Sequence, residues 1–249
     1  MVRPSAQREM EIGLEVFFTD TAGSGGKLKV EAEDFIVDEV SKYPPEKPDG
    51  KVCVARVTAT NWETNRLVRH MSKALGISRN RIGFAGTKDK RAVTSQLMSF
   101  EAPVADVMAL RLSQVAVEGG YMAKRGMTIG DLVGNNFKIR VRDTQLKGEE
   151  LRSSLRGTES SLRELGGFPN FFGVQRFGTV RPVTHLVGRA IVKGDLEQAV
   201  LLYIGNPSEE EDEQSRAARE ALQRDRDYAA ALRDFPWKLT FERMVIGFL

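Results

Sequence analysis

The stretch GFAGTKDKRAVTSQ, residues 83–96, runs from a glycine-containing loop into a strand-like segment. It contains one acid, Asp89, which lies between Lys88 and Lys90 and is followed closely by Arg91. Nearby cations favour the ionised form of a carboxylate. The pattern therefore predicts a charged Asp89 at neutral pH, which serves either as a reacting group or as a turn residue, a common role for Asp.

The loop also has to be compared with phosphate-binding loops, which are rich in Gly, Thr and Lys. The P-loop pattern GxxxxGK[ST] is not met, because GFAGTKDK has a different spacing and Asp89 follows the lysine. A carboxylate held among cations suits a nucleophile, or an anchor for a sugar hydroxyl beside phosphates. From the residues alone, this role and the simpler turn-capping role both stay open.

Composition indicates a globular protein without a membrane span. The chain has 249 residues, of which 41% are hydrophobic and 29% charged, and no run of about 18 apolar residues occurs. One cysteine and two histidines make a disulfide framework or a zinc site unexpected. The formal net charge is only +3, but basic residues outnumber acidic ones over 51–142, as a polyanionic partner would require. We expect a cytoplasmic protein without a metal or cofactor.

The first half of the chain reads mainly as strands. Residues 27–40 indicate two short strands around a polar turn at 31–34, and residues 51–60 indicate a strand covered on both faces. The segment 61–76 changes to a helical period, with Thr64 as a candidate N-cap and Gly76 at the C-terminal end. Two further strand-like segments cover 112–120 and 137–142, the latter with one apolar and one cationic face.

The second half reads mainly as helices, which cover 149–167, 182–194, 195–205 and 208–225. The last of these is expected to begin at a Ser208 cap, with the acidic run 209–213 as a solvated first turn. Strands followed by helices predict an α+β domain joined to a mostly helical one.

Four segments resemble one known family. FAGTKDKRAVTSQ resembles the signature of the TruD family of tRNA pseudouridine synthases, in which the acid of the K-D motif is the catalytic aspartate. LKVEAEDFIVDEV (28–40), GNNFKIRVR (134–142) and PNFFGVQRFG (169–178) are similar to three other motifs of that family and follow the same order. The helix expected at 61–76 also fits the family's pattern.

This resemblance implies a fold and a domain division. The expected fold is an α+β catalytic domain with a mixed, largely antiparallel sheet flanked by helices, and an inserted, mostly helical TRUD domain. Residues 1–165 would form the N-terminal part of the catalytic domain, and 166–249 the beginning of the insertion. Family members are longer, and this chain stops at the apolar RMVIGFL. We therefore expect a truncated, monomeric chain without the C-terminal return of the catalytic domain, which a second chain could supply.

The resemblance also implies an activity. Members of the family isomerise a uridine of tRNA, at position 13, to pseudouridine without a cofactor or metal. The expected partner is therefore tRNA, and the enzyme class is an isomerase. The alternative is a catalytically inactive RNA-binding fragment that keeps the cationic cleft.

Particular residues take roles from the resemblance. Asp89 would be the catalytic carboxylate, Lys29 would hold it ionised and oriented, and Glu33 would support Lys29 or the loop. Phe137 would stack on the flipped uracil, although by pattern alone it is a core phenylalanine. Asn135 would hydrogen-bond the aspartate or the base. The phosphate-contact candidates are Lys88, Lys90 and Arg91, and the residues expected to line the cleft are Asn170, Gln175 and Arg176.

Overall fold

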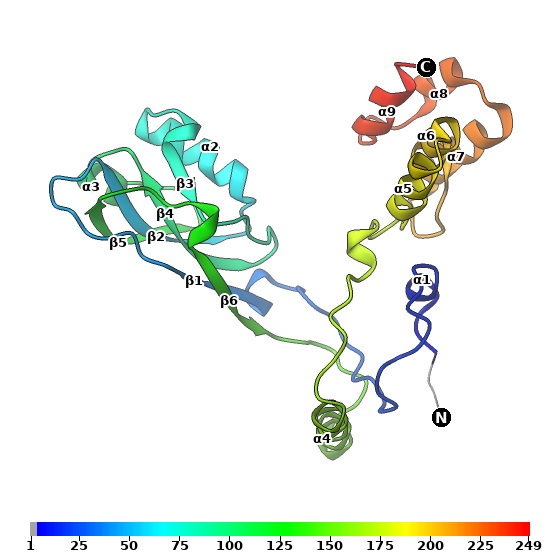
Figure 1. The fold of residues 1–249 in the computed structure, drawn as a ribbon, viewed down its shortest axis with the longest axis horizontal. Coiled ribbons are helices and arrows are strands. Elements are labelled where there is room, and N and C mark those ends of the chain that lie inside the picture. Colours follow the sequence, from blue (N-terminus) through cyan, green and yellow to red (C-terminus); the bar gives the residue numbers. More distant parts are fainter. Residues whose placement is uncertain (1–3) are drawn as a thin grey trace. The chain divides into compact units, whose positions relative to one another are not determined.

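The computed structural model describes residues 4–249, which form two compact units. One unit is Gly23–Arg152, and the other joins the residues up to Ala22 to Ser153–Leu249 (Figure 1). The first contains the strands and the second is helical. The predicted α+β class is thus confirmed.

Six strands form one sheet in the order β5-β2-β4-β1-β6, with β3 paired to β4. β1 and β4 run parallel, whereas the other pairings are antiparallel, so the predicted mixed, largely antiparallel sheet is also confirmed. The strands are β1 (Phe35–Ser41), β2 (Val52–Thr60), β3 (Ile82–Phe84), β4 (Val93–Phe100), β5 (Val115–Ala123) and β6 (Leu132–Ile139).

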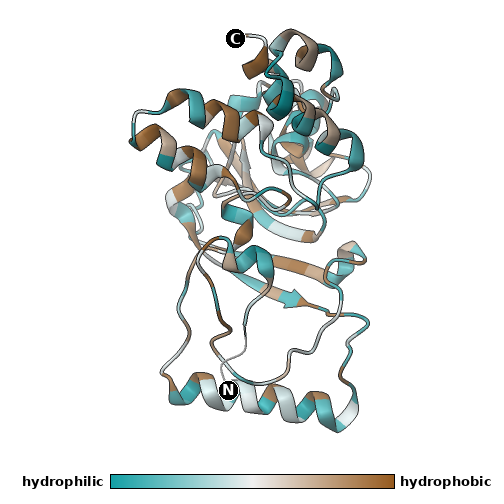
Figure 2. Ribbon diagram, turned by 90° about the vertical axis from the view of Figure 1, so that its right-hand side faces the viewer, coloured by the Kyte–Doolittle hydropathy of each residue, from teal (hydrophilic) through white to brown (hydrophobic). Residues whose placement is uncertain are grey.

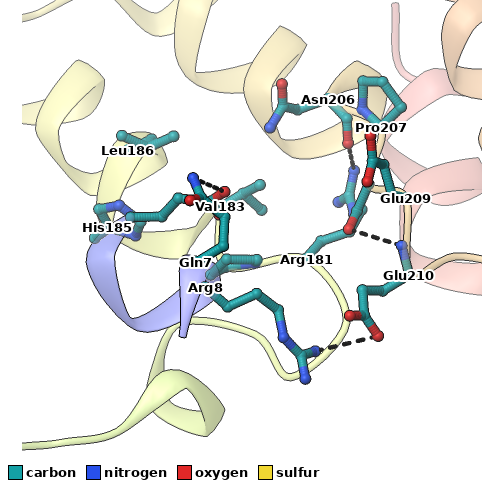
Figure 3. Close-up of a pocket in the computed structure, with 13 residues that line it drawn as sticks. Gln7, Arg8, Arg181, Val183, His185, Leu186, Asn206, Pro207, Glu209 and Glu210 are labelled. Atoms are coloured by element: carbon teal, nitrogen blue, oxygen red, sulfur yellow. Dashed lines mark hydrogen bonds and ion pairs between the residues drawn. The ribbon is translucent and has the colours of Figure 1, made fainter. Parts of the chain in front are cut away.

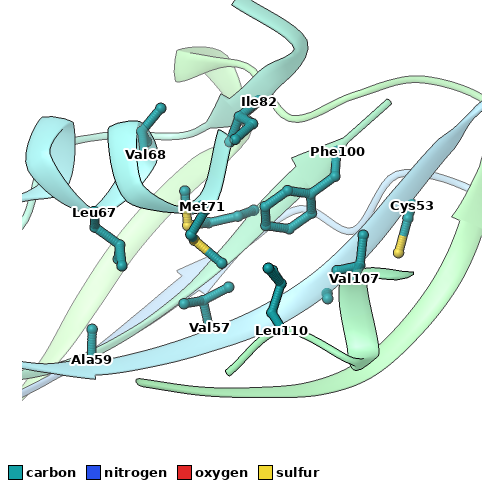
Figure 4. Close-up of a cluster of buried hydrophobic side chains, with 12 residues drawn as sticks. Cys53, Val57, Ala59, Leu67, Val68, Met71, Ile82, Phe100, Val107 and Leu110 are labelled. Carbon is teal, nitrogen blue, oxygen red and sulfur yellow. The ribbon is translucent and has the colours of Figure 1, made fainter. Parts of the chain in front are cut away.

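One face of the sheet is covered by two helices, α2 (Thr64–Leu75) and α3 (Val104–Met108). Apolar residues of α2, among them Leu67, Val68 and Met71, recur at helical spacing and belong to the cluster on the sheet; Figure 4 shows Met71 beside Phe100. The helix ends at Gly76, whose φ of +65° is the left-handed conformation expected there.

The N-cap of α2 differs from the expectation by one residue. The Glu63 side chain, not that of Thr64, accepts the free backbone N–H groups of Asn65 and Arg66. The Thr64 hydroxyl is engaged elsewhere, since it accepts a hydrogen bond from the backbone N–H of Lys88 at 2.8 Å. This contact ties the start of α2 to the loop that contains Asp89.

β2 is covered on both faces, as its apolar sequence predicts. Cys53 and Val57 lie in the cluster under α2 and α3, and Val54 lies in a second cluster on the opposite face, with Leu97. Burial raises the pKa of the Cys53 thiol to about 11, so the thiol stays neutral at physiological pH.

The segment before β1 does not form the first of the two strands expected over 27–40. Lys27 makes an isolated bridge to Arg142, and a 3₁₀ turn covers Ala32–Asp34. The side chains of Glu31 and Asp34 bond backbone N–H groups of this turn in a capping box, which favours the turn over an extended strand. β6 begins at Leu132, five residues before the strand predicted over 137–142, and ends at Ile139.

The helical unit packs around its own core, which contains Ile204, Leu222, Ala231, Phe235 and Ile246. Its helices are α1 (Gln7–Met10), α5 (Thr184–Val192), α6 (Leu196–Gly205), α7 (Glu213–Asp225), α8 (Tyr228–Asp234) and α9 (Thr240–Ile246). α4 (Gly148–Glu164) buries none of its residues, and hydrophilic and apolar positions are interspersed along it in Figure 2. Within residues 4–249, no helix has both the length and the apolar character needed to cross a membrane.

The acidic run before α7 is solvated as the sequence suggests at Glu209, Glu210, Asp212 and Glu213, but not at Glu211. Asp212, not Ser208, caps the helix by accepting the backbone N–H of Ser215. The Glu211 side chain is buried and lies 2.8 Å from the buried guanidinium of Arg219. Arg219 also contacts Glu242 at 2.8 Å. A buried guanidinium needs such counter-charges, and Glu211 is therefore drawn into the interior.

Candidate active site

The loop between β3 and β4 presents Asp89 to a lysine from a distant part of the chain. The Lys29 Nζ atom lies 2.6 Å from the Asp89 Oδ1 atom, and the two side chains are 30% and 46% exposed. The backbone of Lys29 has a φ of +55°, a conformation that costs energy for a residue with a Cβ atom. The 3₁₀ turn and β1, which follow directly, hold this backbone in place.

An aromatic pair adjoins the same ammonium group. The Lys29 Nζ atom lies 3.9 Å from the centre of the Phe35 ring, on its face. The Phe35 and Phe137 rings meet edge to face with their centres 5.9 Å apart. Asp89, Lys29 and Phe137 are therefore brought together through Phe35, a residue that the motif EDF contains but that received no role from the sequence.

The alternation of its strand alone would make Phe137 a core residue, but the structure leaves it exposed. It pairs with Val37 of β1 and remains 56% exposed. β6 pairs with β1 on one side, and no other strand in the described part of the chain pairs with it. An exposed aromatic ring can serve as a stacking platform for a base.

Asn135 lies on the same face of β6, two residues before Phe137, and pairs with Glu39 of β1. Its Oδ1 atom is buried and has no hydrogen-bond partner in residues 4–249. A buried amide oxygen without a donor is costly, so Asn135 keeps an unsatisfied acceptor on the strand that carries the aromatic ring.

The three basic residues of the loop have different environments. Lys90 and Arg91 are exposed, and the Arg91 guanidinium donates to the backbone carbonyl of Val30 at 2.6 Å. Lys88, in contrast, faces inwards: its Nζ atom lies 2.6 Å from the Glu39 Oε2 atom, and the two side chains are 5% and 0% exposed. The Lys88 ammonium is thus not accessible for the phosphate contact expected of it, because it neutralises a buried carboxylate.

Glu33 does not support Lys29 or the loop in the way that was expected. The Glu33 side chain is exposed and has no hydrogen bond or ion pair with any residue from 4 onwards. Its neighbour Asp34 is fully buried and accepts a hydrogen bond from the Arg142 Nε atom at 2.7 Å. This guanidinium lowers the pKa of Asp34 and fixes the turn that precedes β1. The buried role of Asp34 and that of Glu39 were not evident from the sequence, since both acids look like surface residues.

Asn170, Gln175 and Arg176 belong to the helical unit, where all three are exposed. Gln175 and Arg176 form a 3₁₀ turn, Val174–Arg176. The Arg176 guanidinium lies 5.5 Å from the centre of the exposed Phe172 ring. A cation beside an exposed aromatic ring is a combination that suits RNA, and their contact with a substrate stays a prediction.

The helical unit also contains a hollow of about 550 Å³ (Figure 3). Three of its charged side chains are engaged with the protein: Arg8 lies 3.5 Å from Glu210, and Arg181 donates to the carbonyls of Tyr203 and Asn206. Within residues 4–249, no three His, Cys, Asp or Glu side chains gather as metal ligands do.

Fold and site together define an α+β protein whose β3–β4 loop holds a carboxylate against a lysine ammonium, with an aromatic pair next to that ammonium. The model of the family tRNA pseudouridine synthase D (TruD) matches residues 11–249. The chain therefore belongs to the TruD family.

Relatives agree with this membership. A "Probable tRNA pseudouridine synthase D" from Methanosarcina acetivorans is 43% identical over 97% of this chain and 55% of its own length. Another from Archaeoglobus fulgidus is 40% identical, with 96% and 56% covered. A Methanosarcina mazei protein assigned as TruD has a solved structure that matches with a TM-score of 0.85 and 40% identity, over 98% of this chain and 56% of that one. The chain thus spans about half the length of the relatives that it matches.

Proposed function

We propose that this chain carries the catalytic carboxylate of a tRNA pseudouridine synthase, which isomerises the uridine at position 13 of tRNA. The observation that carries the proposal is the Asp89 carboxylate, held 2.6 Å from the Lys29 ammonium and joined through Phe35 to the exposed Phe137. Membership of the TruD family supports it. Residues 1–165 would belong to the catalytic domain and 166–249 to the inserted TRUD domain.

The proposed reaction requires a carboxylate beside the ribose. The C1′–N1 bond of uridine breaks, the uracil rotates, C5 bonds to C1′, the proton on C5 leaves, and N1 takes up a proton. Asp89 either attacks C1′ or removes a proton from the sugar, and both roles need its ionised form. The Lys29 ammonium favours that form and fixes the orientation of the carboxylate.

The base needs a surface that holds it once it has left the RNA stack. Flipping a nucleotide costs a few kcal/mol. Stacking on Phe137 offsets roughly 1–3 kcal/mol of this cost, and the ring is exposed enough to accept a base. Asn135 would hydrogen-bond the Asp89 carboxylate or the base through its side-chain amide.

The RNA backbone would be bound by exposed cations. Lys90 and Arg91 lie directly after Asp89, are exposed, and would contact phosphates close to the flipped nucleotide. Asn170, Gln175 and Arg176 would contact the RNA from the helical unit. Such contacts release counterions, so the affinity for tRNA should fall steeply with salt.

The test is an isomerisation assay. Unmodified tRNA transcript with tritium on C5 of its uridines is incubated with residues 1–249, and with the Methanosarcina mazei relative for comparison. Release of tritium, with pseudouridine mapped to position 13, is the expected result. If both proteins bind tRNA but release no tritium, the alternative holds, in which the cationic surface belongs to a catalytically inactive RNA-binding protein.

A further inference from the structure

Lys88 is fixed to the protein at both ends. Its backbone N–H donates to the Thr64 hydroxyl at the start of α2, and its ammonium lies 2.6 Å from the Glu39 carboxylate on β1. Thr64 and Glu39 are themselves buried. Because a lysine side chain loses considerable rotamer freedom when it is held in this way, the arrangement needs a compensating gain.

The Glu39 carboxylate is the centre of a polar row on the face of the sheet that α2 covers. Its Oε1 atom accepts from the Leu97 N–H at 3.3 Å and from the Ser41 hydroxyl at 2.5 Å. On one side of Glu39, Asn135 of β6 is its direct partner. On the other side lies β4, where Ser95 pairs with Asp38, so the next residue of β4, Gln96, lies alongside Glu39. Asn135 and Gln96 each have a buried oxygen without a hydrogen-bond partner in residues 4–249.

Each member of this row presents a side-chain oxygen, and the Lys88 ammonium supplies the positive charge beside the Glu39 carboxylate. A buried carboxylate without a cation would be strongly destabilising, and breaking such a pair typically costs about 3–5 kcal/mol. A buried ion pair is nevertheless weak evidence that the pair serves stability alone. Apolar residues of similar volume often replace such a pair without loss of stability. The position of this pair in the loop therefore calls for another explanation.

The explanation lies in the residue that follows. Lys88 and Asp89 are adjacent, yet the first side chain is 5% exposed and the second 46% exposed. The buried Lys88 side chain fixes the loop backbone from the side of the sheet. On the exposed side, Lys29 holds the Asp89 carboxylate, and the Arg91 guanidinium donates to the Val30 carbonyl. The loop is thus held from two sides.

We propose that the buried Lys88–Glu39 pair, with the Thr64 hydroxyl, is a positioning device that sets the Asp89 carboxylate against the ribose. This inference rests on the proposed isomerase activity and makes Lys88 a positioning residue, not a phosphate ligand. Displacing a catalytic group by about 1 Å lowers a rate on the order of 100-fold, so kcat is the quantity that the pair should control.

The test compares single and double variants. Lys88→Met and Glu39→Gln each leave one member without its partner and should lower the melting temperature. The double variant Lys88→Met/Glu39→Gln removes both charges and should regain much of the stability, while its kcat stays about 100-fold below wild type with KM for tRNA unchanged. The control is Arg81→Met/Glu101→Gln, which removes a half-exposed ion pair of the same unit and should leave kcat unchanged. A stable double variant with the kcat of the wild type would overturn the proposal.

A second variant and a second measurement keep the test independent of folding and of activity. Thr64→Val keeps the volume of the side chain and the ion pair but removes the acceptor of the Lys88 N–H, and we expect about a 10-fold loss in kcat, the equivalent of one lost hydrogen bond. Hydrogen exchange at the Lys88 amide should be slow in the wild type and fast in Thr64→Val, and the double variant should accelerate it without affecting the amides of β2. If the Lys88 amide exchanges at the same rate in the wild type and in these variants, the pair and the Thr64 hydroxyl do not position the loop. Absence of isomerisation in the wild type, with the exchange result as expected, contradicts only the proposed function.

Discussion

The Lys29 ammonium and the Asp89 carboxylate form a 2.6 Å ion pair across 60 positions of the sequence. Three features make this contact possible: the left-handed backbone of Lys29, the 3₁₀ turn after it, and the parallel pairing of β1 with β4. The parallel pairing places the N-terminal ends of β1 and β4 side by side, so the segments that enter both strands meet there. A reactive carboxylate is thereby positioned by the topology of the sheet.

Replacing Lys29 should lower catalysis more than binding. Lys29→Met keeps most of the side-chain volume but removes the charge that holds Asp89, and we expect kcat to fall about 100-fold because the carboxylate loses its orientation. Lys27→Met is the matched control, since Lys27 pairs with the exposed Asp143 at 3.1 Å. Steady-state kinetics with tRNA check the prediction, and equal losses in the two variants would contradict it.

Removing the Phe137 ring should weaken the hold on the flipped base. Phe137→Ala is expected to lower kcat/KM by the equivalent of roughly 1–3 kcal/mol, the usual contribution of a base–aromatic stack. Val133→Ala removes an exposed apolar side chain from the same strand and should change kcat/KM little. If the Phe137 variant keeps the kcat/KM of the wild type, the ring is not the stacking platform.

The stability of the strand-containing unit should depend on pH through Asp131. Arg125 forms two 2.6 Å hydrogen bonds with this carboxylate and lowers the pKa of Asp131 to about 2. A lowered pKa means that the stabilisation is complete above the ordinary value of 3.8 and is lost as the pH falls towards 2.

Asp131→Asn should therefore destabilise the unit by about 1 kcal/mol at pH 7, a value discounted because solvent screens the half-exposed Arg125. The difference from wild type should vanish near pH 2. Urea titrations at several pH values, followed by Trp62 fluorescence in a Trp237→Phe background, provide the measurement. A difference that does not depend on pH would show that the ion pair is not its source.

The helical unit should depend strongly on Arg219. Its side chain is 1% exposed and lies 2.8 Å from both Glu211 and Glu242. Arg219→Met leaves these carboxylates with only the longer contacts to Arg181, at 3.7 and 4.0 Å, and should cost about 3 kcal/mol. Arg216→Met removes the exposed pair with Glu220 and should cost less than about 1 kcal/mol. Urea unfolding followed by Trp237 fluorescence, in a Trp62→Phe background, distinguishes the two. Similar midpoints for the two variants would contradict a structural role for the buried cluster.

Much of the fold was predictable because its elements are encoded locally. The apolar run of β2, the helical period of α2 and the left-handed Gly76 each depend on residues close in sequence. The strand expected at 27–30 was wrong because side chains of Glu31 and Asp34 capture the backbone there, and α8 and α9 were not foreseen because both are short.

The site was less predictable, because its polar pairs join distant segments. The motif around Asp89 marked the loop, but the sequence contains no signal that directs Lys88 to Glu39 or Asp34 to Arg142. The same limit applies to Glu211, whose burial depends on Arg219 in the following helix. In contrast, the exposure of Phe137 conflicts with its strand pattern and agrees with the role that the family resemblance implied.

The most direct measurement is the rate of tritium release from C5-labelled tRNA by Asp89→Asn, made under single-turnover conditions with the enzyme in excess. The matched control is Asp38→Asn, which removes a carboxylate of β1 that pairs with Arg56 at 2.9 Å. We predict that Asp89→Asn binds tRNA with the affinity of the wild type but releases no tritium, whereas Asp38→Asn releases it normally. Tritium release by Asp89→Asn at the rate of the wild type would exclude a catalytic role for Asp89.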